Sequence, residues 1–437
     1  MEITLLNDKY DPETAAMLQA FYSRNHKSIK VRLSEMGEDS ESVKKGLEKW
    51  YVGYGHKSIG QCGSFTIFIE NVSILAAKAI QDSQLYNGQE TSTRFIDFSV
   101  QEMYDYSNPK FAEIQKNWLD FYTNNHQIVL EHVAKTYKLN LDDKVEYKTA
   151  KARTFDILRG FLPAGCKTQL SWHTTFTHAS DRLVQLSYHP LVEVREIAAE
   201  IITQCKNAYP FAFAGIDKDL ERYKDYYTSN SVGINYLDPD TSWLEDYDAL
   251  NHQKIKAKII TNGGFFVDSY DAIDRPRGLN LSKGSNNFGE FNIDYLLDYG
   301  SFRDIQRHRS CHQMLPILTT RFGFHEWYIN ALPKEIQKQA KLLILSQTLD
   351  IQELEGEAVD LQYVIPLGFK VACYMAAKLP SLVYIAEIRS SKTVHPTLRE
   401  IAKVFADEVK EHVDLIYDDQ SEDEIDLRRG TQDIVEK

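Results

Sequence analysis

Leu162-Pro163-Ala164-Gly165-Cys166-Lys167 returns later in the chain as Ile365-Pro366-Leu367-Gly368-Phe369-Lys370. A second landmark follows each stretch in the same order. His189-Pro190 leads into Arg195-Glu196-Ile197-Ala198, and His395-Pro396 leads into Arg399-Glu400-Ile401-Ala402. Two matched landmarks at nearly the same separation are hard to obtain by chance. The sequence therefore predicts two diverged copies of one domain, which are too few and too long for a solenoid array.

The boundary between the copies is expected near residues 225–240, so copy one spans residues 1–230 and copy two spans 231–437. Val232–Pro239 resembles Ile3–Asp8, because both have the pattern of a short strand followed by a turn that contains Asp. A chain of 437 residues is long enough for two or three domains. From about residue 418 the chain is acidic and nearly free of aromatic residues, which predicts a solvated tail.

Within each copy the hydrophobic pattern predicts an α+β fold, with an antiparallel sheet and packed helices. Residues Ser64–Glu70 alternate with a period of two, as in a half-buried strand, and Asn292–Leu297 is expected to form the equivalent strand in copy two. Apolar residues at helical spacing predict the helices. These are Ser73–Ser83, Arg195–Asn207, Ser301–Arg309 and Leu398–Ile416.

The composition is that of an ordinary soluble globular protein, with 43% hydrophobic and 26% charged residues. The formal net charge of −13 argues against general binding to nucleic acid or to an anionic membrane, since both need a basic face. We find no apolar run of membrane-spanning length and expect no signal peptide. The five cysteines are scattered and odd in number, which indicates a reducing compartment and predicts a cytoplasmic protein.

The densest cationic element is Arg303-Asp304-Ile305-Gln306-Arg307-His308-Arg309. On a helix, Asp304 could hold the imidazole of His308 in one tautomer beside the guanidinium groups, an arrangement that suits a large anion. The alternative is an exposed basic turn. A metal site at His308, Cys311 and His312 is disfavoured because Arg307 and Arg309 would repel a cation. We predict no metal.

Arg307-His308-Arg309 resembles the opening of the signature of flavin-dependent thymidylate synthases, R-H-R-x-x-S-x-N-x-x-S-x-R. Copy two keeps only this opening. Copy one keeps the end of the signature, with Ser92 and Arg94 at its last Ser and Arg, and has Asp82-Ser83-Gln84 in place of R-H-R. In copy two the later signature positions hold His312, Met314, Ile317 and Thr319.

In that family, which forms homotetramers, two subunits share each site. One supplies the R-H-R turn and a late arginine that contacts the uracil ring, and its partner supplies the end of the signature and another arginine that holds the nucleotide. By resemblance, copy two keeps the first set with Arg389, and copy one keeps the second set with Arg159. The opposite positions hold Gln362 in copy two and Leu186 or Gln185 in copy one. We infer one preserved composite site per chain and one lost pseudo-symmetric twin.

The resemblance implies a role for each retained residue. Arg389 is the catalytic candidate, because a guanidinium beside uracil would stabilise negative charge on the ring. The hydroxyls and guanidinium at the end of the signature suit a phosphate monoester. The substrate-binding set is Glu90, Thr91, Ser92, Thr93, Arg94, Arg159 and Asp304, and the cofactor-binding set is Arg307, His308, Arg309 and His56.

Each role has a structural alternative. Residues 90–94 could form only a polar turn, and Arg159 could pack its stem beside Phe161 with its head in solvent. Arg389 could be a surface residue that pairs with Glu387 or with the preceding turn, and His56 could cap the turn at Gly55.

The resemblance implies an FAD enzyme that transfers a one-carbon unit from methylene-tetrahydrofolate to deoxyuridylate, with NADPH as reductant. It also implies a homodimer of this chain that rebuilds a pseudo-tetramer. Three alternatives stay open: modification of a different pyrimidine nucleotide, a pseudoenzyme that binds flavin or nucleotide, and a purely structural role.

Overall fold

The computed structural model describes residues 10–24, 28–36, 40–230, 257–262, 275, 279–281, 283–287, 289–356, 358–411, 417–419, 421 and 425–431. The contacts divide the chain into two compact units, which are described separately. Unit 1 comprises Met1–Val72, Ala79–Glu90 and Gln169–Asn235, and unit 2 comprises Ser73–Lys78, Thr91–Thr168 and Tyr236–Lys437. Unit 2 therefore draws on both predicted copies. The predicted copy-two start and its strand at Val232–Pro239 lie outside the described residues, as does the segment Ile3–Asp8.

Unit 1 contains a two-stranded sheet, and helices precede its first strand and follow its second strand along the chain. The strands β1 and β2 continue at one end into unit 2, as does most of α5. The elements are α1 (Pro12–Tyr22), α2 (Ile29–Met36), α3 (Ser40–Leu47), the π-helix η1 (Glu48–Gly53), α4 (Lys57–Gly60), β1 (Ser64–Ser73), α5 (Ile74–Gln81), β2 (Lys167–Thr175), α9 (Phe176–Leu186), α10 (Val192–Ala208) and α11 (Ile216–Asn230).

An aromatic cluster forms the centre of unit 1. Phe65 of β1 lies 5.5 Å from Phe176 and 4.9 Å from Tyr209, measured between ring centroids. The alternation that buries Phe65 and Ile69 shifts by one residue at Asn71, whose φ of 61° is left-handed, so that Val72 faces inward. An extra residue of this kind is a β-bulge.

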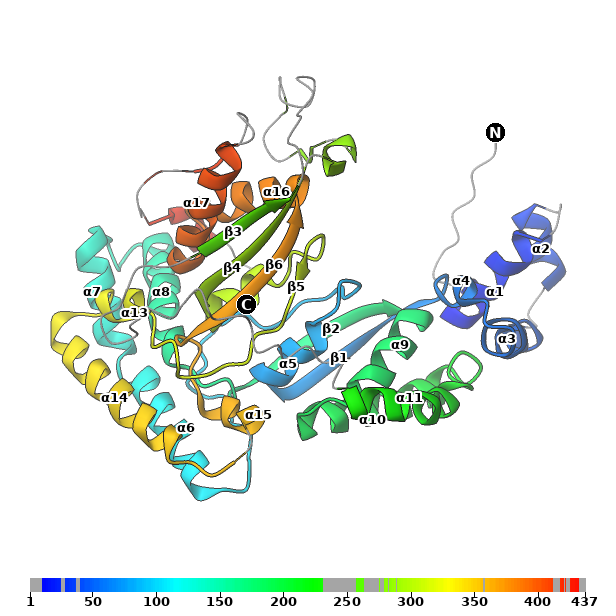
Figure 1. Cartoon of the computed structure of the whole chain (residues 1–437), viewed down its shortest axis with the longest axis horizontal. Coiled ribbons are helices and arrows are strands. Elements are labelled where there is room, and N and C mark those ends of the chain that lie inside the picture. The colour runs from blue at the N-terminus through cyan, green and yellow to red at the C-terminus, as the bar shows by residue number, and fades with distance from the viewer. Residues whose placement is uncertain are drawn as a thin grey trace. The chain divides into compact units, whose positions relative to one another are not determined.

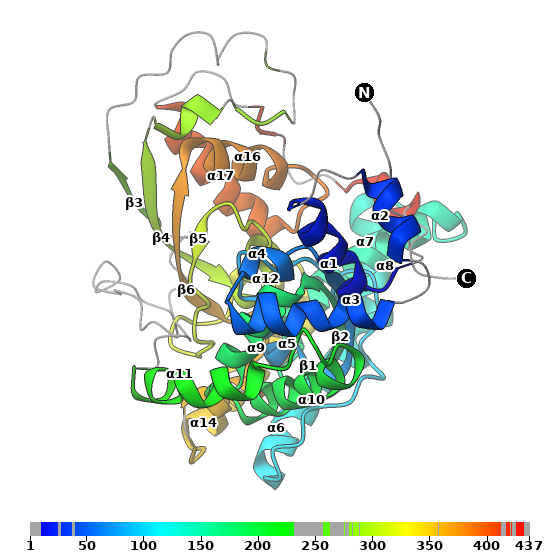
Figure 2. The same ribbon diagram turned by 90° about the vertical axis from the view of Figure 1, so that its right-hand side faces the viewer.

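Unit 2 is built on a four-stranded antiparallel sheet in the order β3-β4-β6-β5. Helices α16 and α17 cover one face of this sheet, as Figures 1 and 2 show, and Tyr295 of β4 contacts Phe405 of α17 at 5.4 Å. The strands are β3 (Ala257–Asn262), β4 (Glu290–Asp298), β5 (His312–Gln313) and β6 (Lys370–Lys378). The helices are α6 (Pro109–Asn124), α7 (His126–Tyr137), α8 (Lys144–Leu158), η2 (Arg159–Phe161), η4 (Lys283–Asn287), α12 (Tyr299–Ile305), α13 (Glu326–Asn330), α14 (Lys334–Gln352), α15 (Ala358–Leu361), η5 (Gln362–Val364), α16 (Leu379–Arg389), α17 (Pro396–Lys410) and η6 (Leu427–Thr431).

The α+β prediction is confirmed, because helices pack with small antiparallel sheets. Both predicted strands form, as β1 and β4, and the predicted helix over 195–207 lies within α10. Two predicted helices end earlier than expected. The helix predicted over 301–309 ends at Ile305, and the described part of the helix predicted over 398–416 ends at Lys410.

The repeated Pro-x-Gly-x-Lys segments pair with each other inside unit 2. Pro163 and Pro366 form an antiparallel bridge. Ala164 N–H donates to the carbonyl of Ile365 at 3.0 Å, and Leu367, its counterpart in the second segment, donates to Leu162 at 2.9 Å. The N–H groups of Gly165 and Gly368 likewise donate to the carbonyls of Tyr363 and Gly160, both at 2.8 Å. This reciprocal pattern is that of a two-fold, self-complementary contact.

The same segments hold equivalent helix starts. Ile74 N–H donates to the carbonyl of Cys166 at 2.9 Å, and Tyr299 N–H donates to that of Phe369 at 3.0 Å. The His-Pro landmarks also share a role, since each imidazole accepts a hydrogen bond from the backbone at the start of the following helix. Leu191 N–H donates to His189 Nδ1 at 3.1 Å, and Thr397 N–H donates to His395 Nδ1 at 3.4 Å. Burial lowers the pKa of His189 to about 3, so that imidazole stays a neutral acceptor.

The expectation of a solvated tail is wrong for the described part of the C-terminal segment. Tyr417 N–H donates to the carboxylate of Glu387 at 2.9 Å, and Asp419 N–H donates to Ser390 Oγ at 2.8 Å. Farther along, Arg429 and Gly430 are buried. These contacts cannot be read from the acidic composition, because a few buried residues decide whether such a segment packs.

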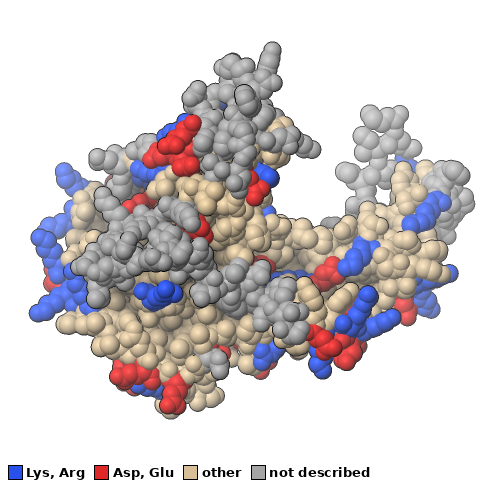
Figure 3. Space-filling view, in the orientation of Figure 1, with Lys and Arg blue, Asp and Glu red and all other residues tan. Residues whose placement is uncertain are grey.

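Among the described residues, no helix combines the length and the apolar character that crossing a membrane requires. On the face of the molecule in Figure 3, the described basic and acidic side chains are interspersed, with broad uncharged areas between them.

Candidate anion-binding site

The Arg307-His308-Arg309 segment lies in a turn that follows α12. Asp298 caps this helix by accepting a hydrogen bond from Ser301 N–H at 2.9 Å. The helix ends at Ile305, and in the turn that follows, the side-chain amide of Gln313 donates to the carbonyls of Ile305 at 3.1 Å and His308 at 2.9 Å. The turn leaves Arg307 exposed and buries His308, whose exposed fraction is 7%.

The imidazole of His308 is held by Arg389 and not, as the sequence suggested, by Asp304. Arg389, the last residue of α16, places its Nε 2.7 Å from His308 Nε2, and its Nη2 donates to the carbonyl of Asp304 at 2.9 Å. A guanidinium only donates, so Nε2 accepts and the imidazole proton sits on Nδ1. Burial, followed by the cations of Arg389, Arg307 and Arg309, lowers the pKa of His308 to about 3. His308 is therefore a neutral group surrounded by cations.

The alternative in which Arg389 pairs with Glu387 is wrong. Glu387 is buried and forms its ion pair with Arg275, and it also accepts a hydrogen bond from Tyr417 N–H. Arg389 Nη1 makes no hydrogen bond to any described residue. One edge of this guanidinium thus remains available to a ligand.

Asp304 and Arg159 form the second pair of the cluster. Arg159 Nη1 lies 3.4 Å from Asp304 Oδ2, and Nη2 donates to Ser301 Oγ at 3.0 Å. Arg159 is 1% exposed, so its head does not lie in solvent as the structural alternative supposed. Its Nε is buried without a hydrogen-bond partner among the described residues. Arg159 is therefore a buried cation that acts on Asp304.

Four guanidinium groups from both halves of the chain act on Asp304. Burial alone would raise the pKa of this carboxyl group, but the four cations outweigh burial and lower the pKa to about 2. In order of effect they belong to Arg159, Arg94, Arg389 and Arg303. Asp304 is the centre of a cationic cluster, and its side chain remains 24% exposed.

The end of the signature contributes Arg94 to this cluster. Its Nε donates to Asp156 Oδ1 at 2.7 Å and its Nη2 to Asp156 Oδ2 at 3.2 Å. Its Nη2 also donates to the carbonyl of Thr393, while Nη1 makes no hydrogen bond to a described residue. Asp156 is fully buried, and the two guanidinium groups of Arg429 and Arg94 hold its pKa well below the ordinary range despite burial.

The remaining predicted residues have different environments. Thr93 is buried and accepts a hydrogen bond from Arg303 at 3.1 Å, so its hydroxyl helps to hold a cation. Ser92 Oγ accepts from Arg94 N–H at 3.2 Å, as in a polar turn, and Thr91 is half-buried. Glu90 belongs to unit 1, where Gln81 donates to its carboxylate at 3.0 Å.

His56 also belongs to unit 1. It precedes α4, makes no capping hydrogen bond through its side chain, and lies 6.3 Å from the rings of both Trp50 and Tyr54. The alternative that the imidazole caps the turn at Gly55 is therefore wrong. Its predicted role toward a cofactor stays a prediction.

Comparisons with known proteins bear on this arrangement. Residues 4–211 match the family model described as thymidylate synthase complementing protein. Over these residues the chain is similar to the thymidylate synthase complementing protein family. The family's name implies a thymidylate synthase-like function.

Similarity to curated relatives continues through the second half. A UPF0159 protein of Chlamydia pneumoniae is 24% identical over 445 residues, which covers 87% of this chain and 81% of the relative. A UPF0159 protein of Chlamydia muridarum is also 24% identical, with 86% and 81% covered. A UPF0159 protein of Thermoplasma acidophilum is 21% identical, with 82% and 85% covered. The family match covers the half with Arg94 and Arg159, and the relatives align along most of both halves.

A metal site at this turn has no support in the geometry. Burial raises the pKa of the Cys311 thiol to about 11, its sulfur donates to the carbonyl of His308, and the Nε2 of His308 is occupied by Arg389. Within the part of the chain that the structure describes, no group of three metal-binding side chains occurs.

Sequence reasoning missed Asp156, Ser301 and Arg429. Asp156 could have been noticed, because it lies three residues before Arg159 near the end of α8, where i and i+3 are neighbours. Nothing in the local sequence marks Arg429, since it reaches Asp156 across 273 residues.

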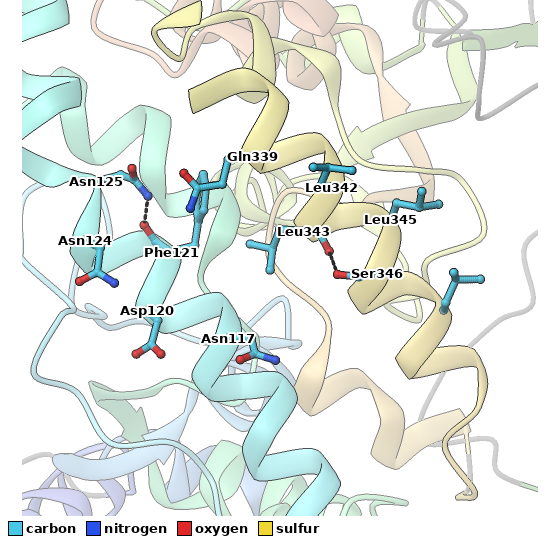
Figure 4. Close-up of a pocket in the computed structure, with 11 residues that line it drawn as sticks. Asn117, Asp120, Phe121, Asn124, Asn125, Gln339, Leu342, Leu343, Leu345 and Ser346 are labelled. Carbon is cyan, nitrogen blue, oxygen red and sulfur yellow. Dashed lines mark hydrogen bonds between the residues drawn. The ribbon is translucent and has the colours of Figure 1, made fainter. Parts of the chain in front are cut away.

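A separate groove of about 590 Å³ lies between α6 and α14 (Figure 4). Asn117, Asp120 and Asn124 line it from α6, and leucines line it from α14. Leu342, Leu345 and Leu349 are each more than half exposed. None of the predicted site residues lines this groove.

Proposed function

We propose that this chain catalyses a flavin-dependent one-carbon transfer to a uridine nucleotide, converting deoxyuridylate to thymidylate with methylene-tetrahydrofolate and NADPH. One observation carries the proposal. Guanidinium groups from the two halves of the chain, Arg94 and Arg159 from the first and Arg303 and Arg389 from the second, act together on Asp304 within unit 2. This convergence supports a single composite site formed within one chain.

The residues at the turn after α12 fit an FAD cofactor. A dinucleotide carries an anionic diphosphate, and Arg307 and Arg309 are charged at any physiological pH. Between them, His308 is kept neutral with its proton on Nδ1, so it adds no negative charge that would repel the diphosphate. Arg307, His308 and Arg309 would hold the cofactor, and His56 is a further candidate. The reduced flavin would supply the hydride.

The nucleotide would contact the free edges of two arginines. Arg94 Nη1 is the donor that suits the phosphate, because the other nitrogens of this group are held by Asp156 and Thr393. Arg389 Nη1 is the donor that suits a uracil oxygen, where a fixed cation would stabilise negative charge developing on the ring. Since His308 and the Asp304 carbonyl already fix Arg389, no reorganisation is needed when the charge forms. The remaining members of the predicted substrate set stay candidates for contact with the nucleotide: Thr91, Ser92, Thr93, Arg159 and Asp304 in unit 2, and Glu90 in unit 1.

We also propose that the chain arose from two tandem copies of one domain, residues 1–230 and 231–437. The reciprocal hydrogen bonds about Pro163 and Pro366 support this proposal, because duplicated subunits would keep their former two-fold contact. The matched order of strand and helix supports it too: β2 and α9 run from Lys167 to Leu186, and β6 and α16 run from Lys370 to Arg389. Because one chain would correspond to two family subunits, a homodimer of this chain would correspond to a family tetramer.

A nucleotide- or flavin-binding pseudoenzyme is the second candidate. It is favoured by Arg159, which the resemblance assigns to the nucleotide but which is 1% exposed and bound to Asp304 and Ser301. In this case the cluster would bind an anion without turnover. Modification of a different pyrimidine nucleotide is a variant of the first proposal with the same residues.

The test is an absorption spectrum of the protein purified without added cofactor, followed by titration with deoxyuridine monophosphate. We expect the visible band of an oxidised flavin and a spectral change on adding the nucleotide. Arg94→Ala and Arg389→Ala should abolish the change, whereas Arg222→Ala, at an exposed position of α11, should keep it. Flavin binding without substrate-dependent turnover would favour the pseudoenzyme. A protein that takes up no FAD would refute the flavoenzyme proposal.

A further inference from the structure

The C-terminal element η6 is seated on α8 by close backbone contact. A Cβ atom placed on Gly430 would lie 2.0 Å from the carbonyl oxygen of Val145, so only glycine fits there. Thr149 Oγ1 donates to the carbonyl of Leu427 at 3.4 Å. This close approach brings the side chain of the preceding residue, Arg429, into the interior, where it is 5% exposed.

Inside unit 2, Arg429 shares a single carboxylate with Arg94. Asp156 is 0% exposed and accepts hydrogen bonds from Arg94 Nε and Nη2 on one side and from Arg429 Nη1 and Nη2 on the other. Arg429 Nη2 also lies 3.4 Å from the carbonyl of Arg94, and its guanidinium lies 5.1 Å from the centre of the Phe95 ring. Arg429 therefore contacts Asp156, which is the side-chain partner of Arg94, and also the backbone of Arg94 and the ring of the next residue, Phe95.

The charge of this group depends on Arg429. Asp156 and Arg94 alone would be a neutral pair, with little long-range attraction for a phosphate. With Arg429 the three groups carry a net charge of about +1 in a buried environment, where charges act over longer distances than in water. Arg429 also fixes the orientation of the Asp156 carboxylate, because it donates to both of its oxygens. A carboxylate fixed in this way restricts the position of the Arg94 side chain that donates to it.

We propose that Arg429 is a positioning residue for the nucleotide phosphate: it holds Asp156 and the turn around Arg94, and thereby aims Arg94 Nη1 and keeps the pocket positive. The role of the phosphate rests on the function proposed above. The hold of Arg429 on the turn around Arg94 does not depend on that function, because it follows from contacts within this chain. The C-terminal segment is then a working part of the site.

The experiment compares wild type with Arg429→Gln, Arg429→Lys and the control Arg428→Gln. Arg428 is the matched control because it lies in the same helical turn, is exposed, and forms an ion pair with Asp426 and with no other described residue. The dissociation constants of deoxyuridine monophosphate and of FAD are measured by calorimetry. Hydrogen exchange is followed in peptides that cover residues 92–98, where the amides of Phe95 and Ile96 donate to the carbonyl of Ser92.

We expect Arg429→Gln to weaken nucleotide binding at least about tenfold, or about 1.4 kcal/mol, and to leave FAD binding nearly unchanged. Arg429→Lys should restore part of the affinity, because it returns the charge without the fork. Arg428→Gln should match wild type. A general loss of folding would weaken both ligands, so the split between them separates positioning from stability.

Exchange in residues 92–98 should be faster in Arg429→Gln, whether or not the nucleotide binds. If the wild type binds no nucleotide, the proposed function fails, and unchanged exchange in 92–98 would overturn the positioning role separately. Equal nucleotide affinity in Arg429→Gln and wild type would also overturn it. If Arg429→Gln does not fold, Arg429→Lys is compared with Arg428→Lys, and equal nucleotide affinity and exchange in these two would refute the inference.

Discussion

Asp156→Asn removes one negative charge from between two buried guanidinium groups while it changes the volume of the side chain very little. The Asp156 side chain is 0% exposed, and those of Arg94 and Arg429 are 13% and 5% exposed. Removing one partner of a buried ion pair costs about 3–5 kcal/mol, because the other charge is left uncompensated. The amide would also direct a donor at one guanidinium. We expect the free energy of unfolding to fall by about 3–5 kcal/mol.

The assay is urea unfolding at about pH 7, followed by circular dichroism. Asp120→Asn is the matched control, since Asp120 forms an ion pair with Lys116 in the same unit but the two side chains are 49% and 70% exposed. An exposed pair contributes roughly 0–1 kcal/mol. The two variants should therefore differ by several kcal/mol. Equal losses below about 1 kcal/mol, with unchanged denaturant dependence, would refute the reasoning.

The difference should also depend on pH in one direction. The pKa of Asp156 is held well below its ordinary value of 3.8, so its contribution is complete above about pH 5 and is lost as the pH falls further. The gap between Asp156→Asn and wild type should therefore be constant from neutral to mildly acidic pH and shrink only in stronger acid. A gap that closed already near pH 6 would contradict the assignment of the effect to this carboxylate.

Three further substitutions test other contacts. The pKa of His308 is lowered from 6.5 to about 3, so between these values the imidazole is protonated in the unfolded chain but not in the folded one, and stability falls as the pH drops. His308→Asn should therefore reduce the slope of the unfolding free energy against pH by about 1.4 kcal/mol per pH unit. Urea unfolding between about pH 4 and 6 measures this slope. Arg389→Ala removes the cation that, after burial, lowers this pKa most, so an NMR titration should find the His308 pKa raised, and an unchanged value would contradict the contact. Gly430→Ala should displace η6 and speed its proteolysis, whereas Gly356→Ala, whose added Cβ would have no neighbour closer than 3.6 Å, should behave as wild type.

The sequence alone determined the local features of this protein. Alternation along Ser64–Glu70 predicted β1, because a strand places successive side chains on opposite faces whatever it packs against. The repeated Pro-x-Gly-x-Lys segments predicted two related halves, and the retained arginines predicted which residues would be near one another. Of these, Arg94, Arg159 and Arg389 do act on one carboxylate.

Only the tertiary structure decided the partner of each charged group. Spacing on a helix suggested that Asp304 would hold His308, but the helix ends at Ile305, and Arg389 takes the imidazole instead. Composition suggested a solvated C-terminal tail, yet Arg429 reaches Asp156. The physical reason is that periodicity depends on the backbone within a few residues. Ion pairs of buried groups depend on which distant segments share a desolvated space, and this is fixed only when the whole chain has packed.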